Sequence, residues 1–582
     1  MKYNSEMKKT IIYAITFLLS MTFAGCGDFF NPDTDDELNG NDYISSKTEM
    51  YTGFLGIMTK LQAVGDKEIL LTDTRADLLE PTTQSTSELI SLYNYAPNLT
   101  GNSYADPAGY YDVIIACNDY LSKMTEFKQK FPQLVDEDVY DALISSTVRI
   151  KVWTYKTIGE IYGQAVWFDD PVTKFEDITK SDKYQLLDMD ALTDKCIALM
   201  DNGYNGIASN ISINWIQWLD PENVTNIASS PYRKWNYMIP PYAGVYSELC
   251  LWKGANLNSK GQDATSYYKT AADVLLAALN EFICNESYAS SGYWLPTAYT
   301  PGRYGAYWDR TDPYANECVA ALLYDYSSHQ TNSLLKHFST EYPNKYLLHP
   351  SEVGRLRFYD ATFNPGVGAS DTRGNLVCRK DGNNYYIGKF RGIGSSYRPN
   401  AYQDDVHIYL YRSTQYHILL AEALNNLGRY SAMNAVLNNG VTTAVYDANS
   451  PEWTGFTKDW TASASWGTRK YPSLGIRGAF GLSARSVKTQ LGSEDVKTVR
   501  KYNDCAILDE TMMEFAVEGK TYPSMIRVAK RYNDYSIIAN RVTPKYPTSQ
   551  QADIRSKILA GGYYVPWNLG LTSSDSSSAK SK

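Results

Sequence analysis

The sequence predicts a mostly α-helical protein in which paired helices form a scaffold and long loops form a second, irregular face. Apolar residues recur at helical spacing over residues 140–163, which end at a glycine, and over 412–440, where Gly428 separates two helices. Stretches rich in aromatic residues and punctuated by Gly and Pro, such as 80–111 and 291–316, lie between the helical segments. Loops of this length are functional or disordered, and disordered segments are poor in aromatic residues. We therefore expect ordered loops laid over a helical scaffold.

The helical segments have the pairing pattern of tetratricopeptide repeats. Small residues such as Ala421 permit close contact between helices, and Tyr430 begins the helix that returns after the glycine. This order of small residues, glycine and tyrosine is typical of tetratricopeptide units. Residues 247–258, followed by 266–279, form a second, looser unit of the same kind.

The N-terminus has the pattern of a lipoprotein signal. Lys8 and Lys9 precede the apolar run 11–23, which is shorter than the ~20 residues that a membrane-spanning helix needs. Small residues stand just before Cys26, as in a bacterial lipoprotein cleavage box, although Phe23 occupies a place where Leu is usual. We expect cleavage before Cys26 and lipidation of Cys26. The alternative is an ordinary signal peptide with a chance cysteine.

Composition narrows the classes of partner. The formal net charge is -9 and no basic stripe occurs, so nucleic acid is not an expected partner. No apolar run after the signal reaches membrane-spanning length. The acidic residues that follow Cys26 would form a solvated tether between a lipid anchor and the folded part.

The cysteines do not form a recognisable disulfide or metal pattern. Of eight in the sequence, seven remain when Cys26 is set aside, and they are widely scattered without a CxxC pair. An odd number excludes complete pairing within the chain. We expect most of them to be buried small hydrophobic residues, with one or two bridges allowed.

The aromatic content is unusual, with 49 Tyr, 12 Trp and 17 Phe. Tyrosine combines apolar contact area with a polar hydroxyl on a stiff side chain. Many of these rings belong to the core, but an excess in loops would suit ligands that have both CH faces and hydroxyl groups. Sugars are such ligands.

Several motifs occur in one order along the chain. They are "CGDFFNP" after the signal, "NECVAALLYDY" (316–326), "ASDTRG" with Asp371 and Arg373, "YLYRSTQYHILLAEALNNLG" (409–428) and "ILDETMMEFAVEGKTYPSMIRVAKR" (507–531). In this order the chain resembles the SusD/RagB family of outer-membrane lipoproteins from Bacteroidetes. The last motif departs from the family pattern, with Thr521 and Ser524 at places where Arg and Asp are usual.

The resemblance implies four tetratricopeptide-like helix pairs that form a superhelical scaffold with a loop-rich ligand-binding face. It divides the chain into a signal peptide (1–25), a lipidated N-terminus and acidic tether (26–40), a single SusD-like domain (41–570) and a disordered tail (571–582). It also implies a surface-exposed, lipid-anchored protein of the outer membrane that captures oligosaccharide or polysaccharide and delivers it to a SusC-like TonB-dependent transporter. Two alternatives stay open, namely peptide binding on the same fold, as in RagB-like members, and a cell-surface glycosidase.

The loop 291–316 is the first candidate for the ligand site. A sugar site needs flat aromatic faces for the ring and polar side chains for the hydroxyl groups, because an unpaired buried hydroxyl costs about 1–3 kcal/mol. In the family, the motif that "NECVAALLYDY" (316–326) resembles forms a strand, and the loop before that strand often contributes ligand aromatics. The candidate residues are Trp294, Tyr299, Arg303, Tyr304, Tyr307, Trp308, Asp309 and Arg310.

The second candidate lies near the N-terminus and comprises Asp73, Arg75, Asp77, Tyr93, Tyr95 and Tyr104. The competing interpretation is a local Asp–Arg pair that closes a turn. A third candidate, which could equally be the core of a loop, comprises Trp453, Trp460, Trp466 and Arg469. Arg373 and Glu422 lie in family motifs, and we interpret them as structural residues that pair across the fold.

Catalysis has little support in the sequence. HExxH, G-x-S-x-G and P-loop motifs do not occur, and the five histidines show no ligand spacing. Sixty-four acidic residues always permit a guess at a glycosidase pair, but the sequence cannot place two of them together. We expect a binding protein without a cofactor. A structural Ca²⁺ ion is the one metal left open, although no EF-hand-type loop occurs.

Overall fold

The computed structural model describes residues 44–171, 184–225, 229–230, 232–284, 318–359, 371–391, 400–441, 450–456 and 475–567, without the side chains of 233–234, 281–284 and 479. The lipidation site Cys26, the acidic tether, the tail and the candidate loop 291–316 lie outside these residues. Those predictions therefore remain predictions.

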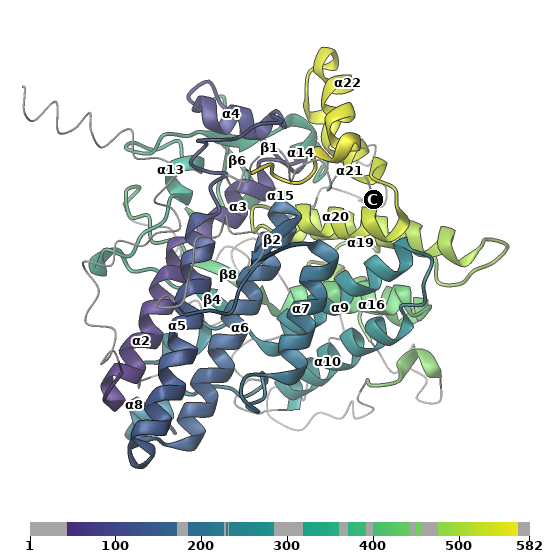
Figure 1. Ribbon diagram of the computed structural model, residues 1–582. Coiled ribbons are helices and arrows are strands. Elements are labelled where there is room, and N and C mark those ends of the chain that lie inside the picture. Colours follow the sequence, from purple (N-terminus) through teal and green to yellow (C-terminus); the bar gives the residue numbers. More distant parts are fainter. Residues whose placement is uncertain are drawn as a thin grey trace, which may run out of the picture.

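The described chain is mostly helical (Figure 1). The helices are α2 Lys47–Ala63, α3 Gly65–Asp73, α4 Ser87–Tyr93, α5 Ala108–Lys130, α6 Glu137–Tyr162, α7 Met189–Asn202, α8 Trp215–Leu219, α9 Tyr242–Ser259, α10 Thr265–Cys284, α13 Leu334–Phe338, α14 Glu352–Leu356, α15 Gly374–Val377, α16 Ser413–Asn426, α17 Tyr430–Leu437, α18 Gly475–Ala479, α19 Val496–Glu514, α20 Thr521–Tyr532, α21 Ser536–Val542 and α22 Thr548–Lys557.

The strands form four small antiparallel sheets of two strands each in the described part. The pairs are β1 (Leu79–Pro81) with β5 (Leu348–Pro350), β2 (Gln164–Trp167) with β3 (Gln185–Asp188), β4 (Cys318–Leu322) with β8 (Ile408–Arg412), and β6 (Cys378–Asp381) with β7 (Asn384–Ile387). Several of these short elements gather above the long helices in Figure 1, where β1, β6 and α13 to α15 lie.

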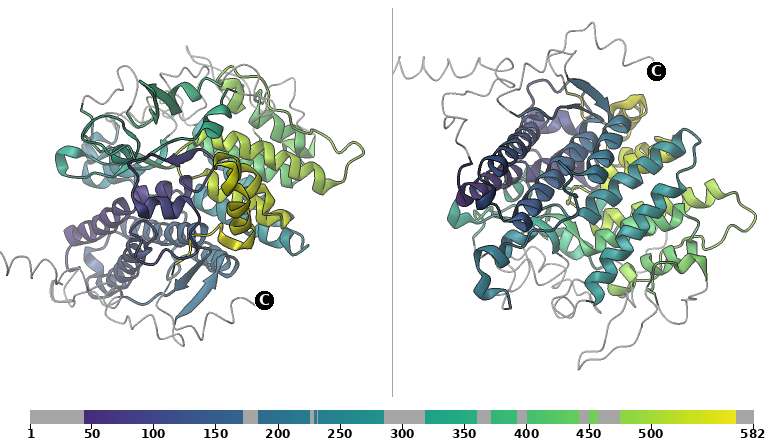
Figure 2. Two further views of the ribbon diagram at one scale, coloured as in Figure 1. Left: turned by 90° about the horizontal axis from the view of Figure 1, so that it is seen from above. Right: turned by 60° about the horizontal axis from the view of Figure 1, so that its bottom comes forward.

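Four helix pairs make up the scaffold. They are α6 with α7, α9 with α10, α16 with α17, and α19 with α20. Each pair contacts the next, because α7 packs on α9, α10 on α16, α16 on α19, and α20 returns to α9. The long helices run side by side when the lower side is turned forward (Figure 2). The predicted fold class, mostly helical with tetratricopeptide-like pairs, is confirmed.

Local sequence explains where these helices end. α6 stops at Gly163, which has φ +75°, and the turn after α16 contains Gly428 with φ +77°. Both values lie in the left-handed region that glycine adopts without a steric penalty. α6 is buried along almost its whole length, and α16 is buried throughout, so both are central to the core. The helices predicted from spacing are therefore present.

One predicted loop is partly helical. The stretch 80–111 contains α4 and the beginning of α5. The hydroxyl of Thr86 accepts a hydrogen bond from the backbone N–H of Leu89 at 3.3 Å, and Leu89 and Leu92 are fully buried. An N-cap and two core leucines suffice to order this two-turn helix within a polar stretch.

The cysteines with described side chains are free thiols. Cys117, Cys196, Cys250, Cys318 and Cys378 are buried, and Cys505 is partly exposed. Burial raises the pKa of the Cys117 thiol to about 12. The prediction that most cysteines are small buried core residues is confirmed for this set.

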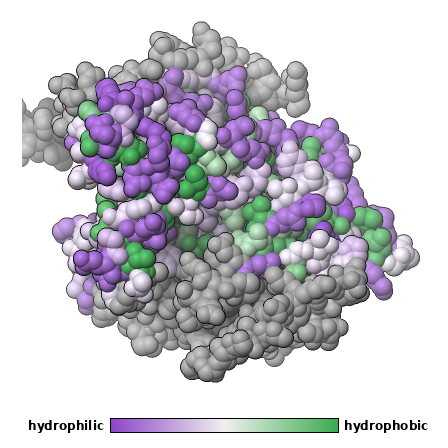
Figure 3. All heavy atoms as spheres, turned by 90° about the horizontal axis from the view of Figure 1, so that it is seen from below, coloured by the Kyte–Doolittle hydropathy of each residue, from purple (hydrophilic) through white to green (hydrophobic). Residues whose placement is uncertain are grey.

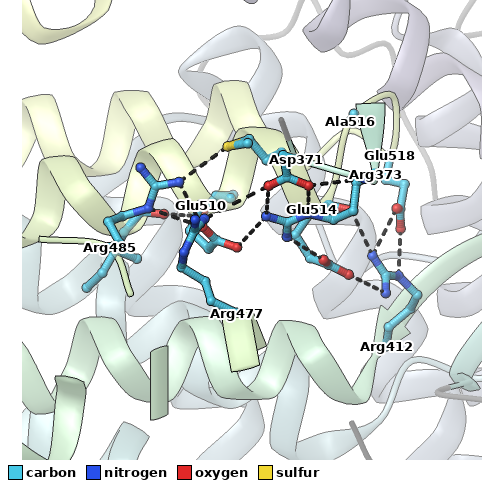
Figure 4. Close-up of polar contacts among 12 residues, drawn as sticks. Asp371, Arg373, Arg412, Arg477, Arg485, Glu510, Glu514, Ala516 and Glu518 are labelled. Atoms are coloured by element: carbon cyan, nitrogen blue, oxygen red, sulfur yellow. Dashed lines mark hydrogen bonds and ion pairs between the residues drawn. The ribbon is translucent and has the colours of Figure 1, made fainter. Parts of the chain in front are cut away.

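Glu510 of α19 lies at the centre of a buried group of charges (Figure 4). It forms ion pairs with Arg373 at 2.7 Å and with Arg477 and Arg485 at 2.8 Å. All four side chains are at most 1% exposed. Burial by itself would raise the pKa of Glu510, but the three guanidinium groups hold it well below its usual range.

The same group extends to the end of β8. Arg412 forms ion pairs with Glu514 at 3.0 Å and with Glu518 at 2.9 Å, while Arg373 also pairs with Asp371 at 2.7 Å. We call this set the charge network. It comprises Asp371, Arg373, Arg412, Arg477, Arg485, Glu510, Glu514 and Glu518.

A second buried group joins α16 to α20. Glu422 accepts hydrogen bonds from Arg527 at 2.9 and 2.7 Å and also pairs with Arg531. The structural interpretation of Arg373 and Glu422 as residues that pair across the fold is confirmed.

Among the described residues, no helix combines the length and apolar character needed to cross a membrane. The face seen from below is mostly hydrophilic where it is described, with hydrophobic residues in scattered groups (Figure 3).

Candidate ligand-binding face

Most of the N-terminal candidate residues lie inside the protein. Asp73, Arg75, Asp77, Tyr93 and Tyr95 are each at most 8% exposed. Asp73 accepts a hydrogen bond from the backbone N–H of Gly519 at 2.7 Å, and burial raises its pKa to about 7. A ligand could reach these side chains only by displacing the contacts that hold them.

Arg75 and Asp77 bind distant parts of the chain, and the local Asp–Arg turn pair is replaced by these contacts. The guanidinium of Arg75 donates to the carbonyls of Gly562 and, at 3.2 Å, Tyr564, and lies 4.1 Å from the ring centroid of Tyr95. Asp77 forms an ion pair with Arg357 at 3.2 Å. The segment that contains Arg75 thus ties the N-terminal helices to the C-terminal end of the described chain.

The remaining two N-terminal candidates are also engaged within the fold. The ring of Tyr93 lies 4.5 Å from that of Tyr546, with the ammonium of Lys545 at 4.5 Å from its centroid. Tyr104 is half-buried, and its hydroxyl is 2.8 Å from Nε2 of His337. The six N-terminal candidates therefore do not form an open aromatic surface.

Exposed aromatic rings gather elsewhere. Four aromatic side chains are exposed in the described part, and all are tyrosines: Tyr326 (38%), Tyr342 (93%), Tyr402 (48%) and Tyr502 (43%). The rings of Tyr326 and Tyr402 lie 5.8 Å apart. Tyr326 follows β4 and Tyr402 precedes β8, and these two strands pair, so the antiparallel ladder brings the two rings together.

Hydrogen bonds join the turn that carries Tyr342 to the same region. The side-chain amide of Asn344 donates to the carbonyl of Ala401 at 2.7 Å, next to Tyr402. The backbone N–H of Asn332 donates to the carbonyl of Asp404 at 2.8 Å. Three segments that are distant in sequence thus present their exposed tyrosines from one connected surface.

The β6–β7 hairpin extends this surface. The hydroxyl of Tyr346 donates to the carbonyl of Tyr385 at 2.5 Å, and Thr340 donates to Asp381 at 2.9 Å. Tyr346 has φ +50°, an uncommon value for an aromatic residue that persists only where surrounding contacts fix it. We define the tyrosine face as Tyr326, Tyr342, Tyr346, Tyr385, Tyr386 and Tyr402, all exposed or half-buried.

A fixed carboxylate lies next to Tyr342. Glu341 accepts hydrogen bonds from Nε and Nη2 of Arg391 at 2.8 and 2.9 Å. The side chain of Arg391 is 3% exposed and that of Glu341 is 42% exposed, so the buried guanidinium fixes a carboxylate that is partly exposed to solvent. A carboxylate held in this way can accept hydrogen bonds from ligand hydroxyl groups with little loss of side-chain entropy.

A pocket of about 420 Å³ lies between α19, α21 and the end of α14. Its charged side chains are already paired with one another, as in Lys501 with Asp534 and Arg541 with Asp509, each at 2.5 Å. Its lining contains no aromatic side chain. This pocket lacks the flat apolar surface that a sugar ring needs, in contrast to the tyrosine face.

No metal site is visible in the described part, where no group of three or more His, Cys, Asp or Glu side chains is arranged to hold an ion.

Comparisons with known proteins relate the chain to others through structure and not through sequence. No family model matches the sequence, and no curated protein sequence is significantly similar to it. Among solved structures, a SusD superfamily protein from Bacteroides vulgatus superposes with a TM-score of 0.58 at 12% identity, over 89% of this chain and 95% of that one. The chain has the SusD-like fold.

Two further solved structures also superpose on the chain over most of its length. B. fragilis NanU superposes with a TM-score of 0.54 at 14% identity, over 87% of this chain and 94% of that one. A protein described as a laminarin-binding SusD-like protein superposes with a TM-score of 0.50 at 12% identity, over 90% of this chain and 98% of that one. The SusD-like fold that the family resemblance implies is therefore confirmed for the part of the chain that the structure describes.

The sequence interpretation missed the tyrosine face, although one signal for it was present. Tyr342 stands in the turn sequence "EYPNK", where Pro and Asn predict a surface turn around an aromatic residue. The other members come from separate segments that only the fold brings together. In the third candidate, Trp453 is 4% exposed and packs 5.2 Å from Phe456, as expected of a loop core; its other members lie outside the described residues.

Proposed function

We propose that the protein is a cell-surface lipoprotein that binds an oligosaccharide or polysaccharide and delivers it to a SusC-like TonB-dependent transporter in the outer membrane. The SusD-like fold supports the class of protein, and the signal pattern ending at Cys26 supports the lipid anchor. The description of one neighbour as a laminarin-binding protein supports a glycan as ligand. The delivery step follows from the family resemblance alone.

The observation that carries the proposal is the connected set of exposed tyrosines. Tyr342 is 93% exposed and shares one surface with the exposed rings of Tyr326 and Tyr402, and contiguous exposed apolar patches mark interaction sites. Rings of this kind stack on the CH face of a sugar, and the partly exposed carboxylate of Glu341, fixed by Arg391, lies beside Tyr342 as a polar group for ligand hydroxyls. The mechanism is binding without bond cleavage. Rings hold the sugar and fixed polar groups orient it.

Affinity electrophoresis tests this proposal. The chain from residue 27 onward would be run through gels that contain neutral or anionic polysaccharides, beside Tyr342→Ala/Tyr402→Ala. We expect retardation by at least one glycan and a loss of about tenfold in affinity for the double variant, about 1.4 kcal/mol. Tyr502→Ala, which removes an exposed tyrosine from α19, should bind as the parent does.

The other outcomes are also informative. Retardation that survives in Tyr342→Ala/Tyr402→Ala but is lost in Trp308→Ala would move the site to the loop 291–316. Absence of retardation by every glycan would refute the glycan proposal and favour peptides as ligands.

A further inference from the structure

The tyrosine face has a cationic corner. The guanidinium of Arg355, on α14, lies 4.5 Å from the ring centroid of Tyr385, and the ammonium of Lys380 lies 5.7 Å from the same centroid. Lys380 and Tyr385 are directly opposite each other in the β6–β7 register. Opposite residues of an antiparallel pair point to the same side of the sheet, so both cations gather around one ring.

These two cations differ from the buried arginines of the protein. No carboxylate of the described residues lies within ion-pair distance, 4.0 Å, of Arg355 or Lys380. Glu352 is one turn earlier on α14, and Asp381 is adjacent to Lys380, but neither pairs with them. Asp381 points to the opposite side of the hairpin, where it accepts a hydrogen bond from Thr340 at 2.9 Å.

A second ring completes the corner. Tyr359 follows α14, is half-buried, and donates a hydrogen bond from its hydroxyl to Asn375 at 3.2 Å. It lies close enough to Arg355 and Tyr385 for both to act on its pKa, which burial raises to about 12. The corner therefore offers two partly exposed rings beside two positive charges that have no acidic partner in the part of the chain that the structure describes.

We propose that this corner is a subsite for an acidic sugar, so that the ligand is a polysaccharide with carboxylate-bearing residues. The inference rests on the proposed glycan-binding function and adds the substrate class. The carboxylate of a uronic acid would accept charge-assisted hydrogen bonds from Arg355 and Lys380, which are about twice as strong as neutral ones, and its ring would pack beside Tyr385 on the tyrosine face.

Net charge makes such a corner necessary for an anionic ligand. A chain with a formal charge of -9 repels a polyanion over most of its surface, so binding requires a local excess of positive charge. The interaction should weaken as salt increases, because Lys380 is exposed and Arg355 is partly exposed, so that ions screen both charges.

The test compares two double variants that each remove two positive charges. Arg355→Gln/Lys380→Gln alters the corner, whereas Lys47→Gln/Lys497→Gln removes exposed lysines from α2 and α19. Each protein is run through gels with polygalacturonate, dextran sulfate or neutral dextran and inulin. We expect retardation by polygalacturonate that falls with NaCl, a loss of about tenfold in the corner variant, and parent behaviour in the control.

Each remaining outcome separates the inference from the function on which it rests. Binding to neutral glycans alone, or equal binding of polygalacturonate by both variants, would overturn the acidic subsite and leave glycan binding intact. Preference for dextran sulfate would replace the carboxylate by a sulfate ester. Failure to bind any glycan would remove the proposed function as well. A lower unfolding temperature of the corner variant with unchanged binding would show that the cations only stabilise the hairpin.

Discussion

The charge network and the tyrosine face use their side chains in opposite ways. In the network, each arginine is at most 1% exposed and is paired with carboxylates from other segments. On the tyrosine face, the turn that carries Tyr342 is held by a hydrogen bond from the Asn344 side chain to the carbonyl of Ala401, while the Tyr342 ring is 93% exposed. The recognisable motifs contribute to the network, whereas the open rings stand mostly in segments without a motif. In this chain, the residues that belong to recognisable sequence motifs therefore build the scaffold, and the proposed ligand site is formed mostly by residues outside them.

The largest effect should come from Glu510→Ala. Removing this carboxylate leaves Arg373, Arg477 and Arg485 with less compensation in the core, and breaking a buried ion pair from one side costs about 3–5 kcal/mol. The free energy of unfolding from denaturant titration measures it. Glu494→Ala, which breaks a half-exposed pair with Lys488, should cost at most about 1 kcal/mol. If both changes lowered the free energy of unfolding equally, the distinction between buried and half-exposed ion pairs would be wrong.

A second effect on stability depends on pH and concerns Asp73. Burial raises the folded-state pKa of Asp73 from its usual 3.8 to about 7. The folded protein therefore binds the proton more tightly than the unfolded chain does. This contribution to stability is fully present below about pH 4 and is lost as the pH rises toward 7, by up to about 1.4 kcal/mol per pH unit. Asp73→Asn should flatten this decline in unfolding free energy between pH 4 and 7, and an unchanged slope would exclude Asp73 as its source.

The smallest effect on stability should come from the tyrosine face. Tyr342→Ala removes a ring that is 93% exposed, so the free energy of unfolding should change by no more than about 0.5 kcal/mol. Thermal and denaturant unfolding check this. A loss above about 2 kcal/mol would mean that Tyr342 is a packing residue, and the contrast between the two regions would fail.

The sequence was sufficient to predict those helices whose formation depends on the local spacing of apolar residues. The helices around residues 140–163 and 412–440 follow from apolar periodicity and from glycines that take a left-handed conformation at their ends. The sequence was insufficient to predict the environment of residues whose hydrogen-bond partners lie far away in the chain. Asp73 and Arg75 read as exposed polar residues because nothing near them reveals the backbone groups of Gly519 and Gly562 that bind them.

The tyrosine face could not be predicted for the same reason, because its residues are distant in sequence and only the fold brings them together. Tyr326 and Tyr402 are more than seventy residues apart, and only the pairing of β4 with β8 places their rings 5.8 Å from each other. Tyrosine content alone predicts sugar binding in general terms, but it cannot separate the exposed rings from the many that are buried, such as Tyr110 and Tyr155.

The charge network also has a consequence for protein engineering. Arg485 fixes the chain just before the exposed residues 489–493, and Glu510 fixes α19 just after them. Because these anchor points are held by ion pairs within the core, the entropic cost of lengthening a segment between anchors grows only slowly with its length. Residues 489–493 are therefore a suitable place to graft a foreign sequence, and a new specificity could be introduced there while α19 and its partners stay intact.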